Sequence, residues 1–230
     1  MTKESIEYPV DQPIDLAHTL VKGAIGIVPG GSVLSELFQT FIPQQFSQRK
    51  EEWGRTVTTR LNHLLGAGFI SQEDLSDNPT FLDALAAASL AALKTSNRIK
   101  REALASAVSS SALQLIEPDL EQIYIRYVDE LTGSHLQLLR TYQSDVLSES
   151  AGSADAMETK FLAIIGQCHP ELEGNIPLIF QLCNDLSTRS LIAVPPKGLR
   201  SLGGINFNCM TITATGIEFL RFISEAREAR

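Results

Sequence analysis

The chain has 230 residues, 43% of them hydrophobic and 20% charged, which is the composition of an ordinary folded soluble protein. Its formal net charge of −8 argues against a general nucleic-acid binder, because attraction to phosphate depends on clustered lysine and arginine. The length suits one large domain or two small ones, and either can bury a core.

The three cysteines are odd in number and widely spaced, at Cys168, Cys183 and Cys209. Such spacing does not indicate a disulfide framework, so we expect a reducing, cytoplasmic environment. Residues 1–13 have no apolar core and contain acidic residues early. We therefore expect a flexible leader there rather than a signal peptide or a transit sequence.

Residues 14–143 have the periodicity of a helical bundle. Apolar side chains recur at steps of one, three and four residues over 33–42 and again over 46–65, and each set forms one apolar stripe of a helix. Gly-Ala-Gly at 66–68 predicts the end of the second of these helices, because glycine readily takes the left-handed conformation of a helix end.

A third helix is predicted to start at Asn78, as the N-cap, and Pro79, as its first residue. The stretch that follows, FLDALAAASLAALK at 81–94, is rich in alanine. Small side chains allow neighbouring helices to approach closely, and alanine has the highest helix propensity. We expect this helix to lie near the middle of the bundle.

Two further apolar stripes follow. A helix beginning near Ser96 places Ile99, Val108 and Leu115 on its inner side, and a longer stripe runs from Leu120 to Tyr142. The first 143 residues thus predict five or six helices joined by short connections.

The composition changes after residue 143. Residues 144–155 are rich in serine and acidic residues, which predicts a linker. The remaining 156–230 predict two helices, two strands and a last helix, which is the outline of a winged-helix module. The predicted elements are helices at 158–168 and from 176, strands within 191–194 and 205–213, and a helix from 215.

The sequence resembles the abortive-infection alpha proteins of bacterial defence over about residues 75–223. The stretches that carry the resemblance are NPTFLDALAAASLAALKT, YVDELTGSHLQLL, LSTRSLI and TITATGIEFLRFI. The resemblance is one of element order and hydrophobic pattern. It implies a cytoplasmic bacterial protein with a role against phage, and it brings no catalytic residue with it.

The stretch GAIGIVPGGSVL at 23–34 is unusually rich in glycine. It matches neither a phosphate-binding P-loop, since Gly31 is followed by Ser-Val, nor the GxGxxG dinucleotide fingerprint. Gly26 and Gly30 have the GxxxG spacing of close helix contacts in membranes, but a spanning helix needs about 20 apolar residues. We predict a turn at Gly30 and Gly31 between two packed helices, with membrane insertion through residues 14–42 as an alternative.

Candidate chemical groups are few. His135 lies on the apolar stripe with no second histidine, cysteine or carboxylate cluster in the sequence pattern beside it, so we expect a histidine at the edge of the core. The cysteine spacing lacks a CxxC pair, and no GxSxG elbow is present. The sequence therefore predicts no enzyme, no metal site and no cofactor.

The winged-helix outline raises DNA binding as an alternative. Its contacts would be Arg189 on the candidate recognition helix with Lys197 and Arg200 in the wing. Residues 155–230 contain eight acidic and seven basic residues, so this region is close to neutral. We therefore favour a non-enzymatic protein-interaction module, with a DNA-binding regulator second and a membrane-active effector third.

One basic cluster, Arg98-Ile99-Lys100-Arg101, begins a predicted helix. Cations at this position oppose the helix dipole, so the cluster indicates either a negatively charged partner or a solvated face. The expected partner is another protein, and self-association into a homo-oligomer stays open.

Overall fold

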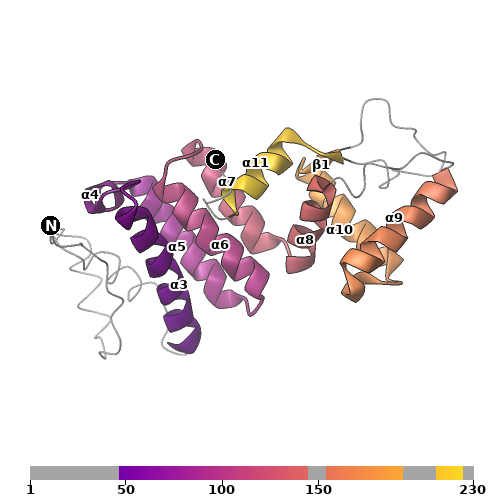
Figure 1. Cartoon of the computed structure of the whole chain (residues 1–230), viewed down its shortest axis with the longest axis horizontal. Coiled ribbons are helices and arrows are strands. Elements are labelled where there is room, and N and C mark those ends of the chain that lie inside the picture. The colour runs from indigo at the N-terminus through magenta and orange to yellow at the C-terminus, as the bar shows by residue number, and fades with distance from the viewer. Residues whose placement is uncertain (1–46, 145–153, 194–210, 225–230) are drawn as a thin grey trace. The chain divides into compact units, whose positions relative to one another are not determined.

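The computed structural model describes residues 47–144, 154–193 and 211–224 (Figure 1). These residues are mainly helical and include one small two-stranded sheet. They form two compact units, the first holding 47–130 with 222–224 and the second 131–144, 154–193 and 211–221. The expected leader and most of the expected linker lie outside the described residues, and the predicted domain limits stay predictions.

The first unit is a set of helices that run up and down beside one another (Figure 1). Its helices are α3 (Ser47–Gly66), α4 (Gln72–Ser76), α5 (Pro79–Lys94), α6 (Arg98–Ala112) and α7 (Pro118–Glu130).

Local chemistry places the helix ends. After α3, Gly68 takes a φ of +74°, and the N–H groups of residues 67–69 donate to carbonyls of the last helical turn, as the Gly-Ala-Gly stretch predicts. Asn78 is the N-cap of α5 and accepts a hydrogen bond from the N–H of Phe81, with Pro79 first in the helix, so that prediction is also confirmed. Asn97 caps α6 in the same way.

Helix α4 was not expected, because five residues are too few for a hydrophobic period. A capping box holds it: the Asp74 N–H donates to Ser71 Oγ and the Ser71 N–H donates to Asp74 Oδ2. These bonds to Ser71 lower the pKa of the Asp74 carboxyl.

The core of the first unit is built on small residues. α5 contacts α3, α4, α6 and α7, so the alanine-rich helix lies in the middle, as predicted. In α6 every residue from 103 to 112 is buried. Larger side chains from the surrounding helices complete the packing, and Trp53, Phe81 and Tyr124 are at most 2% exposed.

Buried hydroxyls in this core have partners. Trp53 Nε1–H donates to Ser89 Oγ at 2.9 Å, and Ser89 Oγ–H donates to the carbonyl oxygen of its own helix four residues earlier. Ser110 Oγ–H donates to the carbonyl oxygen of Phe222, whose ring also lies 5.8 Å from that of Tyr124. The small polar residues are thus compatible with complete burial.

Two expectations for this region were wrong. Leu115 was expected on the inner side of its helix, but α6 ends at Ala112 and Leu115 is 55% exposed in the connection to α7. The stripe from Leu120 to Tyr142 was expected to be continuous, but it is divided between α7 and α8 (Gly133–Gln143). The side chain of Thr132 accepts the N–H of His135 and starts a new helix there.

The second unit contains four helices, a short 3-10 turn and the strand pair. After α8 come α9 (Ala154–Cys168), η3 (Pro170–Leu172), α10 (Ile176–Thr188), β1 (Ile192–Ala193), β2 (Thr211–Ile212) and α11 (Ala214–Phe222), whose last residue groups with the first unit. The strands are antiparallel, with Ile192 opposite Ile212 and Ala193 opposite Thr211. The helix stop at His169-Pro170 is as predicted. None of the helices described here has the length and apolar character needed to cross a membrane.

The burial of Glu121 predicts that the stability of the folded chain depends on pH. This residue is 2% exposed and accepts a hydrogen bond from Ser111 Oγ at 2.6 Å, and its burial raises the pKa of the carboxyl. The folded chain therefore holds this proton to a higher pH than the unfolded chain, so stability falls as pH rises through the folded pKa. Glu121→Gln keeps the acceptor without the charge. We expect its melting temperature to exceed wild type at pH 8 and to converge with it toward pH 4.

Glu117→Gln provides a matched control, because the Glu117 side chain is exposed just before the same helix. It should follow the wild-type pH profile. A Glu121→Gln variant that melts below wild type at pH 8 would contradict the conclusion that burial makes the ionised carboxylate of Glu121 unfavourable.

The close surroundings of Gly216 predict that a larger residue at this position destabilises the fold. A Cβ at this position would lie within van der Waals radii of the Leu191 carbonyl oxygen and 2.8 Å from Ile212 Cγ1. Backbone atoms cannot rotate away, so we expect Gly216→Ala to lower the free energy of unfolding by about 1–3 kcal/mol in chemical denaturation. In the control Gly166→Ala, also inside a helix, the nearest atom is the flexible Glu173 Cγ at 3.4 Å, so we expect no loss and a small gain from the higher helix propensity of alanine.

Candidate functional site

Helix α10 corresponds to the candidate recognition helix of the sequence analysis. Its N-cap Asn175 accepts the N–H of Leu178 at 3.3 Å, and Pro177 lies in the first turn. One face is buried in the second unit through Ile179, Leu182, Cys183 and Leu186. The opposite side presents Ile176, Pro177, Leu178, Gln181, Asn184 and Thr188 to solvent.

The exposed surface at the start of α10 is apolar. Ile176 is 40% exposed and Leu178 38%, and they flank the exposed Pro177. Farther along the helix the exposed groups are uncharged amides and a hydroxyl. The outward side of α10 is therefore an apolar tip followed by a neutral polar face.

A polar network joins α10 to α8 within the second unit. His135, 6% exposed, accepts the backbone N–H of Thr132 at its Nδ1 (3.0 Å). Since Nδ1 is an acceptor, the ring proton is on Nε2, which points to Asp185 Oδ2 at 3.3 Å. The other carboxylate oxygen of Asp185 accepts from Gln181 Nε2–H at 2.9 Å.

The order hydroxyl, imidazole, carboxylate is that of many hydrolase sites, and Thr132 Oγ1 lies 2.8 Å from His135 Nδ1. Two contacts oppose this chemistry. Thr132 Oγ1 is the N-cap acceptor for the N–H of His135, and a backbone N–H already occupies the lone pair of Nδ1. The imidazole therefore cannot take the hydroxyl proton without losing the cap, and the network acts as a structural link between α8 and α10.

Asp185 is the partner of His135 that the sequence reasoning missed. The two residues are 50 positions apart, and no spacing signal joins them. His135 was expected at the edge of the core; the structure shows it buried, with a backbone N–H and a carboxylate as its partners.

A second buried histidine lies beside α8. His169 Nε2 is 2.8 Å from Thr141 Oγ1, while its buried Nδ1 has no hydrogen-bond partner and lies 3.8 Å from Glu171 Oε1. Burial lowers the pKa of His169, although the nearby Glu171 opposes this. The ring is thus held neutral inside the unit.

The described cysteines differ in exposure. Cys183 is buried, and burial raises its pKa to about 11, with Tyr142 OH 3.5 Å from the sulfur. The thiol is therefore protonated at neutral pH and is a poor nucleophile. Cys168 is exposed and Cys209 lies outside the described residues. Over 47–144, 154–193 and 211–224, no three histidine, cysteine or acidic side chains are placed to hold a metal ion.

Of the three expected DNA contacts, the structure describes only Arg189. Arg189 is half-buried at the end of α10 and donates from Nη1–H to the Asp185 carbonyl oxygen at 3.1 Å. Lys197 and Arg200 lie outside the described residues. The glycines of the expected turn, Gly26, Gly30 and Gly31, do so as well, together with the rest of 14–42.

Comparison of this chain with protein-family models, with curated proteins and with solved structures found no match.

The network predicts a cap-dependent stability. Thr132→Ala removes the hydroxyl that accepts the His135 N–H, and we expect the free energy of unfolding to fall by about 1 kcal/mol in urea titration. Ser134→Ala, two residues later in the first turn, is the control and should be neutral or slightly stabilising. Equal loss in both variants would show that the cap is not the cause.

Proposed function

We propose that this chain is a non-enzymatic protein-interaction module whose second unit is a winged-helix-like domain. The resemblance to abortive-infection alpha proteins places this proposal in bacterial defence against phage. The partner is another protein, bound at the exposed side of α10.

The order of elements supports the winged-helix part of the proposal. In the second unit α9 and α10 are followed by an antiparallel strand pair and then α11. A helix pair, two strands and a closing helix is the order that the sequence pattern predicts.

The apolar tip of α10 is the observation that carries the protein-binding proposal. A recognition helix reads DNA with polar and basic side chains near its N-terminus. Here those positions hold Ile176, Pro177 and Leu178, which offer no hydrogen-bond donor to a base edge. Exposed aliphatic side chains next to neutral amides are suited instead to the apolar centre and polar rim of a protein interface.

A DNA-binding regulator is the second candidate. The strand pair that follows α10 favours it, since a basic wing can contact the phosphate backbone. Its contacts would be Arg189, Lys197 and Arg200, and its affinity would fall steeply with salt.

The proposal is tested by placing charge in the apolar tip. We expect the double variant Ile176→Glu, Leu178→Glu to keep its far-ultraviolet circular dichroism and lose specific partners, with recovery in quantitative co-purification reduced about tenfold or more. The control is Ala163→Glu, Gln167→Glu, which adds the same charge at exposed positions of α9 in the same unit. Control and wild type should recover the same partners.

Fluorescence anisotropy with duplex DNA at about 50 mM salt separates the two candidates, because the electrostatic attraction is strongest at low salt. No binding is expected for wild type. Salt-dependent binding that Arg189→Ala weakens, together with unchanged co-purification in the α10 variant, would replace the protein-binding proposal with the DNA-binding one.

A further inference from the structure

The charges of the first unit are divided between its two ends. Helices α3, α5, α6 and α7 alternate in direction, so segments far apart in sequence meet at each end (Figure 1). We call the surface formed by residues 66–83 and 113–120 the acidic end. We call the surface formed by residues 47–56, 94–102 and 126–130 the basic end.

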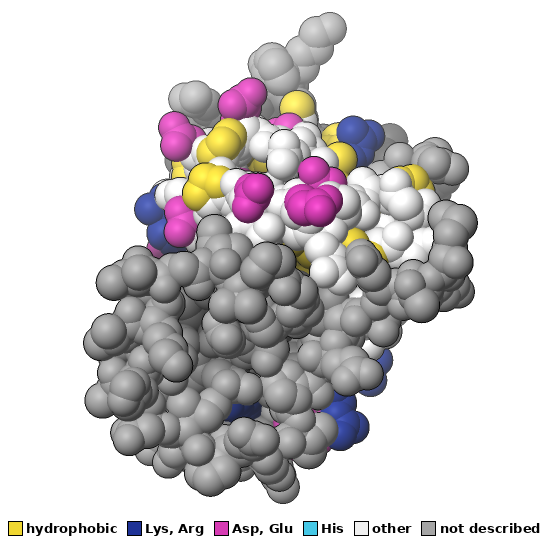
Figure 2. All heavy atoms as spheres, turned by 90° about the vertical axis from the view of Figure 1, so that its left-hand side faces the viewer, with side chains coloured by type: hydrophobic (Ala, Val, Ile, Leu, Met, Phe, Trp, Pro, Cys, Tyr) yellow, Lys and Arg dark blue, Asp and Glu magenta, His cyan; other side chains and the backbone are white. Residues whose placement is uncertain are grey.

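The acidic end carries six exposed carboxylates and contains no lysine or arginine. Figure 2 views the described side chains around α4 and shows Asp and Glu among hydrophobic groups there. The six are Glu73, Asp74, Asp77, Asp83, Glu117 and Asp119.

Two of the most exposed large hydrophobic side chains of the described residues also belong to the acidic end. Phe69 is 51% exposed after α3, and Leu115 is 55% exposed before α7. An apolar group set among charges is the composition of an interface centre and its rim.

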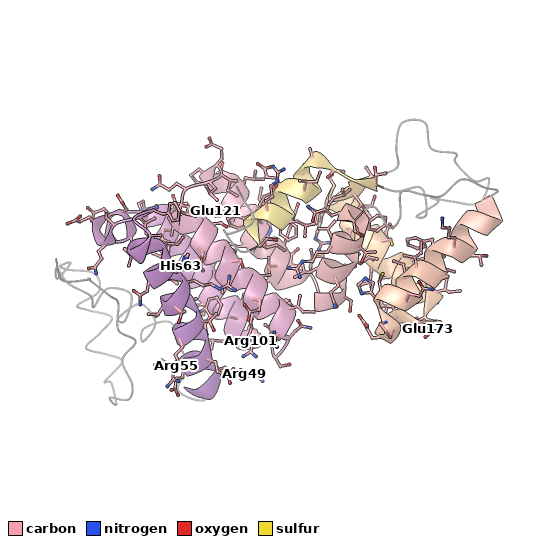
Figure 3. All side chains as sticks on the ribbon, viewed as in Figure 1. Arg49, Arg55, His63, Arg101, Glu121 and Glu173 are labelled. Atoms are coloured by element: carbon pink, nitrogen blue, oxygen red, sulfur yellow. The ribbon has the colours of Figure 1, made fainter. Side chains whose placement is uncertain are left out.

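The basic end has the opposite sign. Its three segments contain eight basic and five acidic residues, in a chain whose net charge is −8. Arg49, Arg55 and Arg101 all lie toward this end, away from His63 and Glu121 (Figure 3). Leu90, 44% exposed, lies on α5 one turn before Lys94, so an apolar side chain borders the basic end.

Contacts between the helices hold the basic end together. Arg49 Nη1–H donates to the Leu93 carbonyl oxygen at 3.2 Å, and Arg101 pairs with Glu52 at 2.7 Å. Lys100 Nζ donates to the Asp129 carbonyl oxygen at 2.8 Å. The starts of α3 and α6 and the ends of α5 and α7 therefore form one surface.

Several of these charges are paired with each other. Lys94 lies 3.3 Å from Asp129 Oδ2, and Arg55 pairs with Glu51, but these are exposed pairs on the surface. Such pairs contribute little to stability and exchange partners at low cost. Arg98 is exposed in the first turn of α6 and adds a positive charge to the surface of this end.

We propose that the acidic end of one copy of this chain binds the basic end of another, so that the chain associates head to tail. The acidic end and the basic end are both present on one unit and are opposite in charge, and an exposed apolar side chain lies at or beside each of them. Because the two ends are different surfaces, this is a heterologous contact, which extends from copy to copy. The proposal is independent of the α10 surface.

The net negative charge of the chain opposes self-association at long range. At about 0.1 M salt this repulsion is screened beyond about 10 Å, while charges in contact across an interface are screened less. The expected contact therefore forms near physiological salt and weakens at about 0.5 M salt, where the attraction at the interface is also reduced.

Two charge-reversal variants of the full chain test the proposal. The acidic-end variant is Asp77→Lys, Glu117→Lys, and the basic-end variant is Lys94→Glu, Arg98→Glu. All four side chains are exposed, and glutamate at the first position of α6 suits the helix dipole. The control is Arg140→Glu, Lys160→Glu, which reverses two exposed charges of the second unit.

Sedimentation velocity is measured at about 0.1 M and 0.5 M salt over a range of protein concentrations. Wild type and control should show concentration-dependent association at the lower salt, with the dissociation constant raised at least tenfold at the higher salt. Each end variant alone should associate at least tenfold more weakly than wild type, because the substitutions reduce the attraction at one surface of the contact. Their equimolar mixture should recover association, because the basic end of the first variant and the acidic end of the second are both unchanged and match.

Three results would overturn the proposal: wild type that is monomeric at every concentration, association as strong in both end variants as in wild type, or a mixture that associates no more strongly than the separate variants while both are folded by circular dichroism. Retention of monomeric wild type on heparin, lost in the basic-end variant, would assign the basic end to a polyanion instead.

Discussion

The close approach of α5 to α6 is the constraint on which the first unit depends. Alanine and serine at the contact let the two helix backbones come near each other, so that residues 103–112 are buried on every side. Such proximity leaves no space for water, and each serine hydroxyl has to find its partner in the protein, as Ser89, Ser110 and Ser111 do. The large side chains of α3 and α7 then fill the outer part of the core.

In the second unit α8 has the comparable role, and its buried leucines are accompanied by polar contacts. His135 and Thr141 reach Asp185 and His169, and Tyr142 reaches Cys183. Each of these groups could in other surroundings take part in acid-base or nucleophilic chemistry. Here their hydrogen bonds cap a helix or satisfy a buried atom, and burial keeps the thiol and the phenol protonated by raising their pKa values.

Both proposals start from side chains that folding leaves exposed. The apolar tip of α10 follows from a helix that begins with Ile-Pro-Leu after an asparagine cap. The separation of charge in the first unit follows from helices of alternating direction, which gather residues 66–83 with 113–120 at one end and 94–102 with 126–130 at the other. A sequence with the same net charge and a different helix order would not have oppositely charged ends.

The sequence by itself determined the helical class, the caps at Asn78 and Pro79, the end of α3 and the stop at His169-Pro170, because each depends on backbone preferences of a few adjacent residues. Only the tertiary structure decided the pairing of His135 with Asp185, the exposure of Leu115 and the division of the stripe from Leu120 to Tyr142 into two helices. The periodicity of the sequence shows which residues are apolar, but it does not show which distant side chains these residues contact. That choice is made by packing, which acts between segments that the chain itself keeps far apart.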